Sequence, residues 1–522
     1  MPAFRFRYTG SFQAPMSLVC VLSCTTPFRL SAMEVDHYTT SSVSSPAENI
    51  DEANMNHVIV APLLFPRSVW KRIALFYIPD GHNDPVKSAK ARGVAASVCR
   101  ELWHLVYDDP SFWSTINLNL NITPERVAFV LDKCGDSELH IRVALIDVRG
   151  PSDYTLESEP SVESLIDRML SAISPTSARW RSFFFYTEHP GAFNKVRDVC
   201  FGLSAPILTS ISIRYGYMPG YSEFDELDAI YEEPKEAYDW FNRTFSHLDH
   251  LELSTVYFPW NTDLFGSLTT LDLSDFDDLR WDFILSLFAD ASNLLFLRLD
   301  TFSGFTVPDG AKLSSNSLLV VDLGFGGHRC LVNLLTALIT PNVADLTLRD
   351  INDNLPTILQ CGVLLGQLVR FAVYGRVTYQ STPVYDRAVL QLFDSMPLLQ
   401  VLDLHHAYPY LFTSYCVWTS RQLRSPAPSV TGLHSLRALY IARAALPQLL
   451  TFLVSHGIDD GSSGNHMNLR TIRALPSLPS DNPELWLWFK DHVTDFGCIQ
   501  FVDRTLSVIC GPSYHSLYCF LP

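Results

Sequence analysis

Residues that could perform chemistry are plentiful in this sequence, but their spacing forms no active-site motif. No G-x-S-x-G, H-E-x-x-H or phosphate-loop sequence occurs. His405 and His406 are adjacent on a predicted strand, where neighbouring side chains point to opposite faces and cannot chelate one metal ion. Gly324, Gly326 and Gly327 lack the G-x-G-x-x-G spacing, so they predict a turn and not a nucleotide site. We therefore expect no catalytic residue, no metal and no cofactor.

A dense run of carboxylates between residues 221 and 240 is the strongest charge feature. Aromatic residues are interleaved with the acids, and Lys235 is the only base. Such a segment could recognise a basic protein partner through aromatic anchors and complementary charge. It could equally be a solvated insertion that keeps the chain soluble, and both interpretations stay open. Partner binding would use Glu223, Asp225, Glu226, Asp228, Glu232 and Glu233.

Three further carboxylates recur at one position of a repeated pattern. Asp272, Asp322 and Asp403 each occupy the x of an L-x-L triplet. In a strand this position points away from the leucine-bearing face. The three could form an acidic stripe on a binding surface. The simpler interpretation, which we favour, is that they are the polar half of an alternating strand.

The elements that carry these residues repeat along the chain. From residue 138 onward, short L-x-x-L-x-L-like triplets alternate with helical stretches, and the spacings between Leu248 and Leu368 are 20, 26, 24, 25 and 25 residues. This period lies within the range of leucine-rich repeats, although later gaps widen to 31, 37 and 33. The triplets begin at Leu208, Leu248, Leu268, Leu294, Leu318, Val343, Leu368, Leu399, Leu436 and Leu469.

Helical periodicity between the triplets completes a strand-and-helix unit. We expect helices over 282–291, 330–340, 386–396, 447–455 and 483–492. One such unit cannot bury both of its faces, so stacked neighbours would supply the core, with parallel strands on the concave side and helices on the convex side. The fold class predicted for 121–522 is therefore α/β, as an irregular leucine-rich-repeat solenoid. An open doubly wound sheet is the alternative.

A small helical module precedes the repeats, over residues 58–120. Pro66 suits the first turn of a helix whose apolar residues follow at i, i+3 and i+4, and Pro79 ends that helix. A second helix is expected from Val86 to Asp109. Its apolar stripe, together with Phe112 and Trp113, is too wide for one helical hairpin to bury. Its apolar residues are Val94, Val98, Leu102 and Leu105.

The amino-acid sequence of this module resembles the F-box of fungal F-box proteins. The resemblance rests on Phe-Pro-x-x-Val-Trp-x-x-Ile from Phe65, Val-Cys-Arg-x-Leu-x-x-Leu from Val98, and Asp-Pro-Ser-Phe-Trp from Asp109. It departs from the family pattern at Phe65, where leucine is usual, and at Ser68, where an acid is usual. Leu102 also stands where tryptophan is common, and the polar insertion 80–90 is long. The repeats resemble the degenerate leucine-rich arrays that follow F-boxes.

The resemblance implies a substrate-recognition subunit of a ubiquitin ligase and not an enzyme. The F-box would dock to the Skp adaptor of a cullin ligase, and the solenoid would hold an unknown target protein near the ubiquitin-loaded partner. One alternative is a repeat scaffold whose F-box has drifted and has no ligase role. Another is an enzyme with a site built from strand-end loops. Adaptor contact is assigned to Phe65, Pro66, Val69, Trp70, Ile73, Val98, Leu102 and Leu105.

Composition and charge limit the partners and the compartment. The formal net charge of −17 opposes binding to nucleic acid and to anionic membranes, and no apolar run is long enough to span a bilayer. The 11 cysteines are odd in number and form no C-x-x-C pair, which predicts reduced thiols in a cytoplasmic or nuclear protein. Residues 1–57 are expected to be a flexible extension.

Overall fold

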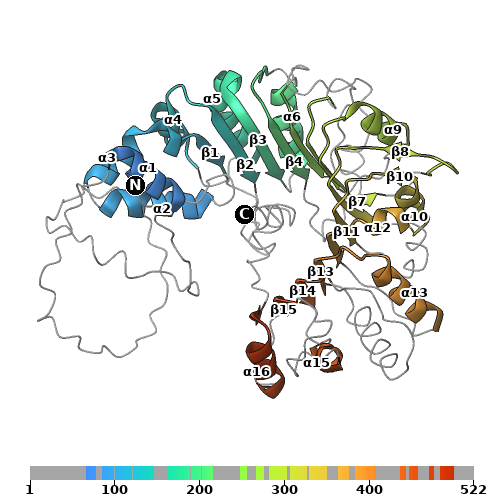
Figure 1. Cartoon of the computed structure of the whole chain (residues 1–522). Helices are drawn as coiled ribbons and strands as arrows, with labels where there is room; N and C mark the ends of the chain where they lie inside the picture. The colour runs from blue at the N-terminus through green and yellow to red at the C-terminus, as the bar shows by residue number, and fades with distance from the viewer. Residues whose placement is uncertain are drawn as a thin grey trace, which may run out of the picture. The chain divides into compact units, whose positions relative to one another are not determined.

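The computed structural model of the chain divides into two compact units (Figure 1). The first comprises residues up to Asn117 together with Ala128–Ser137, and the second comprises Leu118–Val127 and the chain from Glu138 onward. The predicted extension 1–57 and the acidic segment 221–240 lie outside the described residues. The structure describes residues 66–77, 85–98, 100–119, 122–145, 162–187, 190–201, 203–215, 247–254, 266–274, 281–302, 306–325, 328–349, 362–374, 383–406, 435–441, 446–455, 469–474 and 483–498.

Three helices and a short 3-10 turn form the core of the first unit. They are α1 (Arg67–Tyr77), α2 (Pro85–Val98), α3 (Arg100–Asp108) and η5 (Pro110–Phe112). α3 packs against both α1 and α2. Its buried face bears Leu102, Leu105 and Val106, beside the buried rings of Phe112 and Trp113. The module thus buries Leu102 and Leu105 of its apolar stripe by folding three helices together.

The single second helix expected from the sequence is wrong, because two helices replace it. α2 and α3 pack side by side, so Val94 on α2 does not share a face with Leu102 and Leu105 on α3. The consequence is a difference in burial: Val94 is 43% exposed, whereas Leu102 and Leu105 are 6% and 2% exposed. A straight helix would have left most of this stripe without a partner, and the paired arrangement removes it from water.

The end of the module leads into the sheet through β1 (Thr115–Leu118) and α4 (Pro124–Cys134). Thr123 caps α4, since its side-chain oxygen accepts a hydrogen bond from the Arg126 amide at 3.4 Å, and Pro124 fills the first helical position. α4 ends at Gly135, whose φ of 52° is the left-handed conformation that ends many helices and that glycine adopts without strain. A short turn then leads from α4 to the strand that begins at Leu139.

Among the described residues, fourteen strands form one large sheet, and their order in the sheet is their order in the chain. Every neighbouring pair from β2 onward is parallel. After β1, the strands of this sheet are β2 (Leu139–Leu145), β3 (Trp180–Thr187), β4 (Ser210–Tyr215), β5 (His250–Ser254), β6 (Thr270–Ser274), β7 (Phe296–Phe302), β9 (Val320–Phe325), β11 (Asp345–Arg349), β12 (Arg370–Tyr374), β13 (Val401–His406), β14 (Ala438–Ile441), β15 (Thr471–Ala474) and β16 (Asp495–Cys498). A small second sheet pairs β8 (Leu313–Ser314) with β10 (Leu338–Ile339).

All ten predicted triplets are strands, and each strand begins two residues after the first apolar residue of its triplet. The register places the second apolar residues in one row, so that Leu251, Leu271 and Leu297 lie opposite one another on successive strands. The first apolar residues, from Leu208 to Leu436, are also buried. The repeated leucines therefore form one continuous core along the sheet.

Helices connect many of the strands, and α5, α6, α9, α10 and α13 lie on one side of them (Figure 1). The five predicted helices are confirmed as α9, α10, α13, α15 and α16, with ends shifted by at most three residues. The helices of this unit are α5 (Val162–Ile173), η6 (Ser174–Arg179), α6 (Pro190–Phe201), α9 (Trp281–Asp290), α10 (His328–Ala337), α12 (Gly362–Leu365), α13 (Pro383–Asp394), α15 (Leu446–Ser455) and α16 (Pro483–His492). The predicted α/β class is confirmed.

Candidate functional site

Two regions hold the residues singled out by the sequence: the helical module and the polar side of the sheet. In the module, Pro66 is exposed just before α1, and Val69 and Trp70 on α1 are half-buried. Leu102 and Leu105, which were assigned to adaptor contact, are buried core residues. Phe65 and the side chains of Ile73 and Val98 lie outside the described residues.

An aromatic row that sequence analysis did not single out crosses the module. Trp103 stacks on Tyr107 with ring centroids 4.8 Å apart, Tyr107 lies 5.5 Å from Trp113, and Trp113 lies 5.4 Å from Phe129. The buried Trp113 donates its Nε1 proton to the Val106 carbonyl at 2.7 Å, and the Arg92 guanidinium covers its ring. Trp103 and Phe129, at the two ends, are each 43% exposed. The row joins the core of the module to its surface.

On the sheet, the strand register places the x residues of successive triplets opposite one another, where they form a row of charged side chains. Glu252, Asp272, Arg298 and Asp322 lie directly opposite one another on β5, β6, β7 and β9. Each of the four is at most 8% exposed. Adjacent parallel strands lie about 4.8 Å apart, so these side chains contact one another instead of pointing separately into water.

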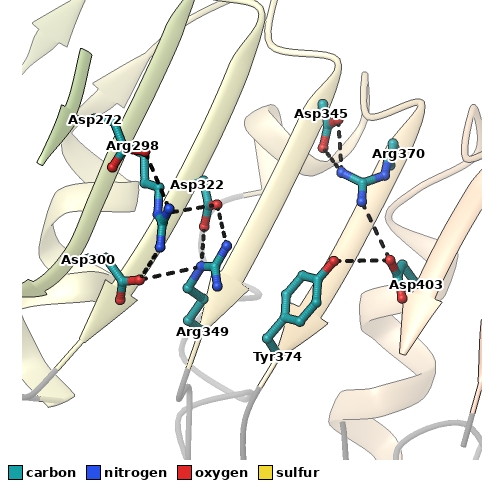
Figure 2. A network of polar contacts seen from close by, with 9 residues as sticks. All are labelled: Asp272, Arg298, Asp300, Asp322, Asp345, Arg349, Arg370, Tyr374 and Asp403. Atoms are coloured by element: carbon teal, nitrogen blue, oxygen red, sulfur yellow. Dashed lines mark hydrogen bonds and ion pairs between the residues drawn. The ribbon is translucent and has the colours of Figure 1, made fainter. Parts of the chain in front are cut away.

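Arg298 is the centre of the network drawn in Figure 2. Its Nη2 donates to Asp300 at 2.7 Å, its Nη1 donates to Asp272 at 3.3 Å, and its Nε lies 3.8 Å from a carboxylate oxygen of Asp322. Arg349 binds the same Asp322 with two hydrogen bonds, of 2.8 and 2.7 Å. Two arginines thus hold three carboxylates from β6, β7 and β9.

The network continues on both sides of this centre. Arg370 donates to both oxygens of Asp345, at 2.9 and 3.0 Å, and reaches Asp403 at 3.5 Å. The Tyr374 hydroxyl also donates to Asp403, at 3.2 Å (Figure 2). On the other side, Glu252 accepts hydrogen bonds from Arg214 and Ser212.

Asp272, Asp322 and Asp403 lie on the polar face of their strands, as favoured from the sequence, but they do not form an exposed acidic stripe. They do lie opposite the leucine face, but they are buried at 3%, 5% and 6% exposure and paired with arginines. The signal was present in the sequence. Aligning the middle residue of successive triplets gives Glu, Asp, Arg and Asp from β5 to β9, which places an arginine between two aspartates. Counting the aspartates alone missed it.

Burial sets the protonation of the carboxylates, and their arginine neighbours act against it. Burial raises the pKa of Asp272 to about 7, because the attraction of Arg298 is too small to offset the desolvation, and Glu252 and Asp322 add repulsion. Burial also raises the pKa of Asp345, against the effect of Arg370. Burial would raise the pKa of Glu252 as well, but Arg214 and the other partners outweigh it and hold this pKa below its usual value. Asp272 is therefore part-protonated near neutral pH.

Gly324 allows this network to close, and the predicted turn at this glycine is wrong. The residue lies within β9 and not in a loop. A Cβ atom there would lie 1.9 Å from Oδ1 of Asp300 and 3.3 Å from Cβ of Arg349. The missing side chain lets Asp300 and Arg349 approach across the strand, with Nε of Arg349 3.7 Å from the Asp300 carboxylate. Gly326 and Gly327 lie outside the described residues.

The other candidate ligands remain apart or undescribed. His405 and His406 are consecutive residues of β13, and their side chains lie outside the described part of the molecule. The described residues contain no group of histidine, cysteine and carboxylate side chains that could hold a metal ion. Cys134 and Cys200 are buried, and neither forms a disulfide bond. Within the described part, no helix has the length and apolarity that a membrane crossing needs.

Comparison with known proteins adds no assignment. No protein family model matches the chain, and no curated protein matches its sequence.

Proposed function

We propose that this chain is the substrate-recognition subunit of a Skp–cullin–F-box ubiquitin ligase. Its helical module would dock to the Skp adaptor, and its sheet-bearing region, as a degenerate leucine-rich solenoid, would hold the target protein. The chain would then promote ubiquitin transfer by raising the effective concentration of the target at the ligase, with no bond chemistry of its own.

The observation that carries this proposal is the coexistence of two features in the expected order. Along the chain, a three-helix module with an F-box-like sequence is followed by a parallel sheet whose strands follow chain order. Doubly wound sheets reverse their strand order at a switch point, whereas the order here runs from β1 to β16 without reversal. In-order parallel strands with repeating leucines are what a solenoid requires.

The module supplies a surface for docking. Pro66, Val69 and Trp70 are at least partly accessible at the start of α1, where the resemblance assigns adaptor contact. Leu102 and Leu105 support this helix from the module's core.

A repeat scaffold with a drifted F-box is the second candidate function. It is favoured by Ser68, which is exposed on α1 where F-boxes usually carry an acid. A scaffold of this kind would keep the target-binding region and lose the adaptor.

Co-purification of the full chain with the Skp adaptor tests the proposal. Binding should be retained by the native chain and lost in a Val69→Asp, Trp70→Ala variant, because both side chains are partly accessible on α1. Circular dichroism of the variant must match the native spectrum. As a matched control, Leu487→Asp alters an exposed leucine on α16, 58% exposed, and should leave adaptor binding intact. A folded native chain that fails to bind the adaptor would exclude the ligase function and favour the scaffold.

A further inference from the structure

The residues that immediately precede the strands from β5 to β14 form a row along the edge of the sheet where these strands begin. Each of them, from Asp249 to Arg437, donates its main-chain N–H to the carbonyl of the corresponding residue before the preceding strand, at 2.8 or 2.9 Å. The spacing of the sheet, about 4.8 Å between strands, therefore extends into this row. We call the residues before β5, β6, β7, β9, β11, β12, β13 and β14 the entry row.

The middle of the entry row is apolar and accessible to solvent. Its four central residues, before four successive strands, are Leu295, Leu319, Ala344 and Val369. Leu295 and Leu319 are each 43% exposed, and Ala344 and Val369 are partly exposed. Single exposed apolar residues are ordinary on a protein surface, whereas a continuous strip of them indicates an interaction site.

The two ends of the entry row are polar and carry opposite charges. Thr269 and Gln400 flank the apolar strip, one on each side. Beyond them lie Asp249, before β5, and Arg437, before β14, and both are exposed. Asp249 and Arg437 are therefore the same number of strands away from the centre of the row.

The main-chain groups of the entry row are already paired within the sheet. The Leu319 carbonyl, for example, accepts hydrogen bonds from the amides of Ala344 and Asp345, at 2.9 and 3.2 Å. The carbonyls of Leu295 and Ala344 likewise accept two amides each. A partner would therefore meet the side chains of the row, on a backbone that loses little freedom when it binds.

The order of residue types makes the entry row complementary to itself. A two-fold axis through its centre, between Leu319 and Ala344, would set the row against the same row of a second copy running in the opposite direction. The apolar residues then meet apolar residues, and the polar residues that flank them meet each other. At both ends, the Asp249 carboxylate of one copy meets the Arg437 guanidinium of the other.

We propose that the entry row is the interface of a two-fold symmetric dimer of this chain. The row spans about 34 Å at the strand spacing of a sheet and about 10 Å in width, which is smaller than a permanent interface requires. The dimer therefore exchanges with the monomer. This inference goes beyond the proposed function and does not rest on it. In either candidate function, a dimer would offer two target sites in one complex.

Sedimentation equilibrium of the full chain, at about 1–200 µM, tests this inference in the range expected for a small interface. The native mass should rise toward twice that of the monomer. Leu295→Ser with Leu319→Ser should weaken dimerisation by about tenfold or more, because two exposed leucines lose apolar contact. As a matched control, Leu285→Ser with Leu487→Ser alters exposed leucines on α9 and α16 and should leave dimerisation within about twofold of native. Urea denaturation must show both double variants to be as stable as native.

Charge reversal gives a second test, whose result misfolding cannot imitate. Asp249→Arg alone and Arg437→Asp alone each place like charges together at both ends of the dimer. Each should weaken dimerisation by about tenfold at low salt. An equal mixture of the two variants restores both pairs of opposite charge, so it should form heterodimers with nearly native affinity. Raising the ionic strength should weaken the native dimer.

Each outcome decides the inference. A mass that rises with concentration, falls in the Leu295 and Leu319 variant and recovers in the mixture of charge variants supports it. A chain that stays monomeric overturns it and leaves the apolar strip for another protein. A dimer that survives both leucine substitutions, or a mixture that does not recover, also overturns it. Adaptor binding is measured separately, and its failure would exclude the ligase function without affecting the dimer.

Discussion

The helical module and the polar side of the sheet differ in whether their charged side chains are exposed or buried. In the module, Arg67 and Arg72 on α1 and Lys90 on α2 are exposed. On the sheet, Arg298 and the arginines that follow it are buried among carboxylates at hydrogen-bonding distance. A surface whose charges are exposed can meet a partner, whereas charges that neutralise one another hold strands together. The same residue types are therefore exposed to solvent in one region and pair neighbouring strands in the other.

Replacing Arg298, the central arginine of the buried network, should have the largest effect on stability. Arg298→Leu leaves Asp272, Asp300 and Asp322 with fewer partners in a buried site. We expect a loss of about 3–5 kcal/mol in the free energy of unfolding, measured by urea denaturation, because an uncompensated buried charge is costly. The exposed Arg437→Leu is the control and should change stability by less than about 0.5 kcal/mol. Equal effects in the two variants would show that the buried network contributes nothing specific.

Adding one carbon at Gly324 should have the next largest effect. In Gly324→Ala the new Cβ meets the Asp300 carboxylate, which Arg298 and Arg349 hold in place. We expect a loss of about 1–3 kcal/mol, as for other overpacked sites, measured by the same denaturation.

Gly266→Ala provides the comparison for this substitution. No atom lies within 4 Å of the added Cβ there, so stability should stay close to native. If Gly324→Ala were as stable as Gly266→Ala, the close approach of Asp300 and Arg349 would not depend on the missing side chain at Gly324.

The buried carboxylate on β6 should make stability depend on pH. Burial raises the pKa of Asp272 to about 7 in the folded state, so between about pH 4 and pH 7 the folded chain keeps a proton that the unfolded chain has released. This group therefore lowers stability as pH rises through that window, by up to about 1.4 kcal/mol per pH unit, and adds no further slope above it.

Asp272→Asn replaces the titrating carboxyl group with an amide, so the difference between variant and native stability measures the contribution of that group. The stability of the variant relative to native should rise between pH 4 and pH 7, as followed by urea denaturation at several pH values. Taking the difference cancels the opposite slope from His250, whose pKa burial lowers. The exposed Asp290→Asn should run parallel to native. A parallel profile for Asp272→Asn as well would contradict a neutral-pH proton on β6.

The smallest expected effect is a gain in stability, at an exposed position of the helical module. Gly93→Ala places a better helix former inside α2, where the new Cβ meets no atom within 4 Å. Thermal unfolding should show the module more stable by up to about 1 kcal/mol. A loss of stability would mean that Gly93 is packed against another part of the chain.

The repeats of the sheet region were predictable because their signal is local. Each triplet alternates apolar and polar residues at the spacing of a strand, and each helix of this region shows an apolar period of 3.6. The break between α2 and α3 was not predictable from periodicity. Val94, Val98, Leu102 and Leu105 fit one continuous helical stripe, and only the packing of α3 on α2 decides which of them is buried.

The sequence by itself determined the ten strands of the triplets, the five helices expected between them and the row of leucines that forms the core, since these follow from residue type at short range. Only the tertiary structure decided what the polar residues do. Asp272 and Arg298 are 26 residues apart in the chain, and the register of β6 with β7 makes them neighbours. Their burial and the raised pKa of Asp272 depend on side chains from several strands. A charge becomes solvated or paired according to what the fold places beside it, and no local pattern contains that information.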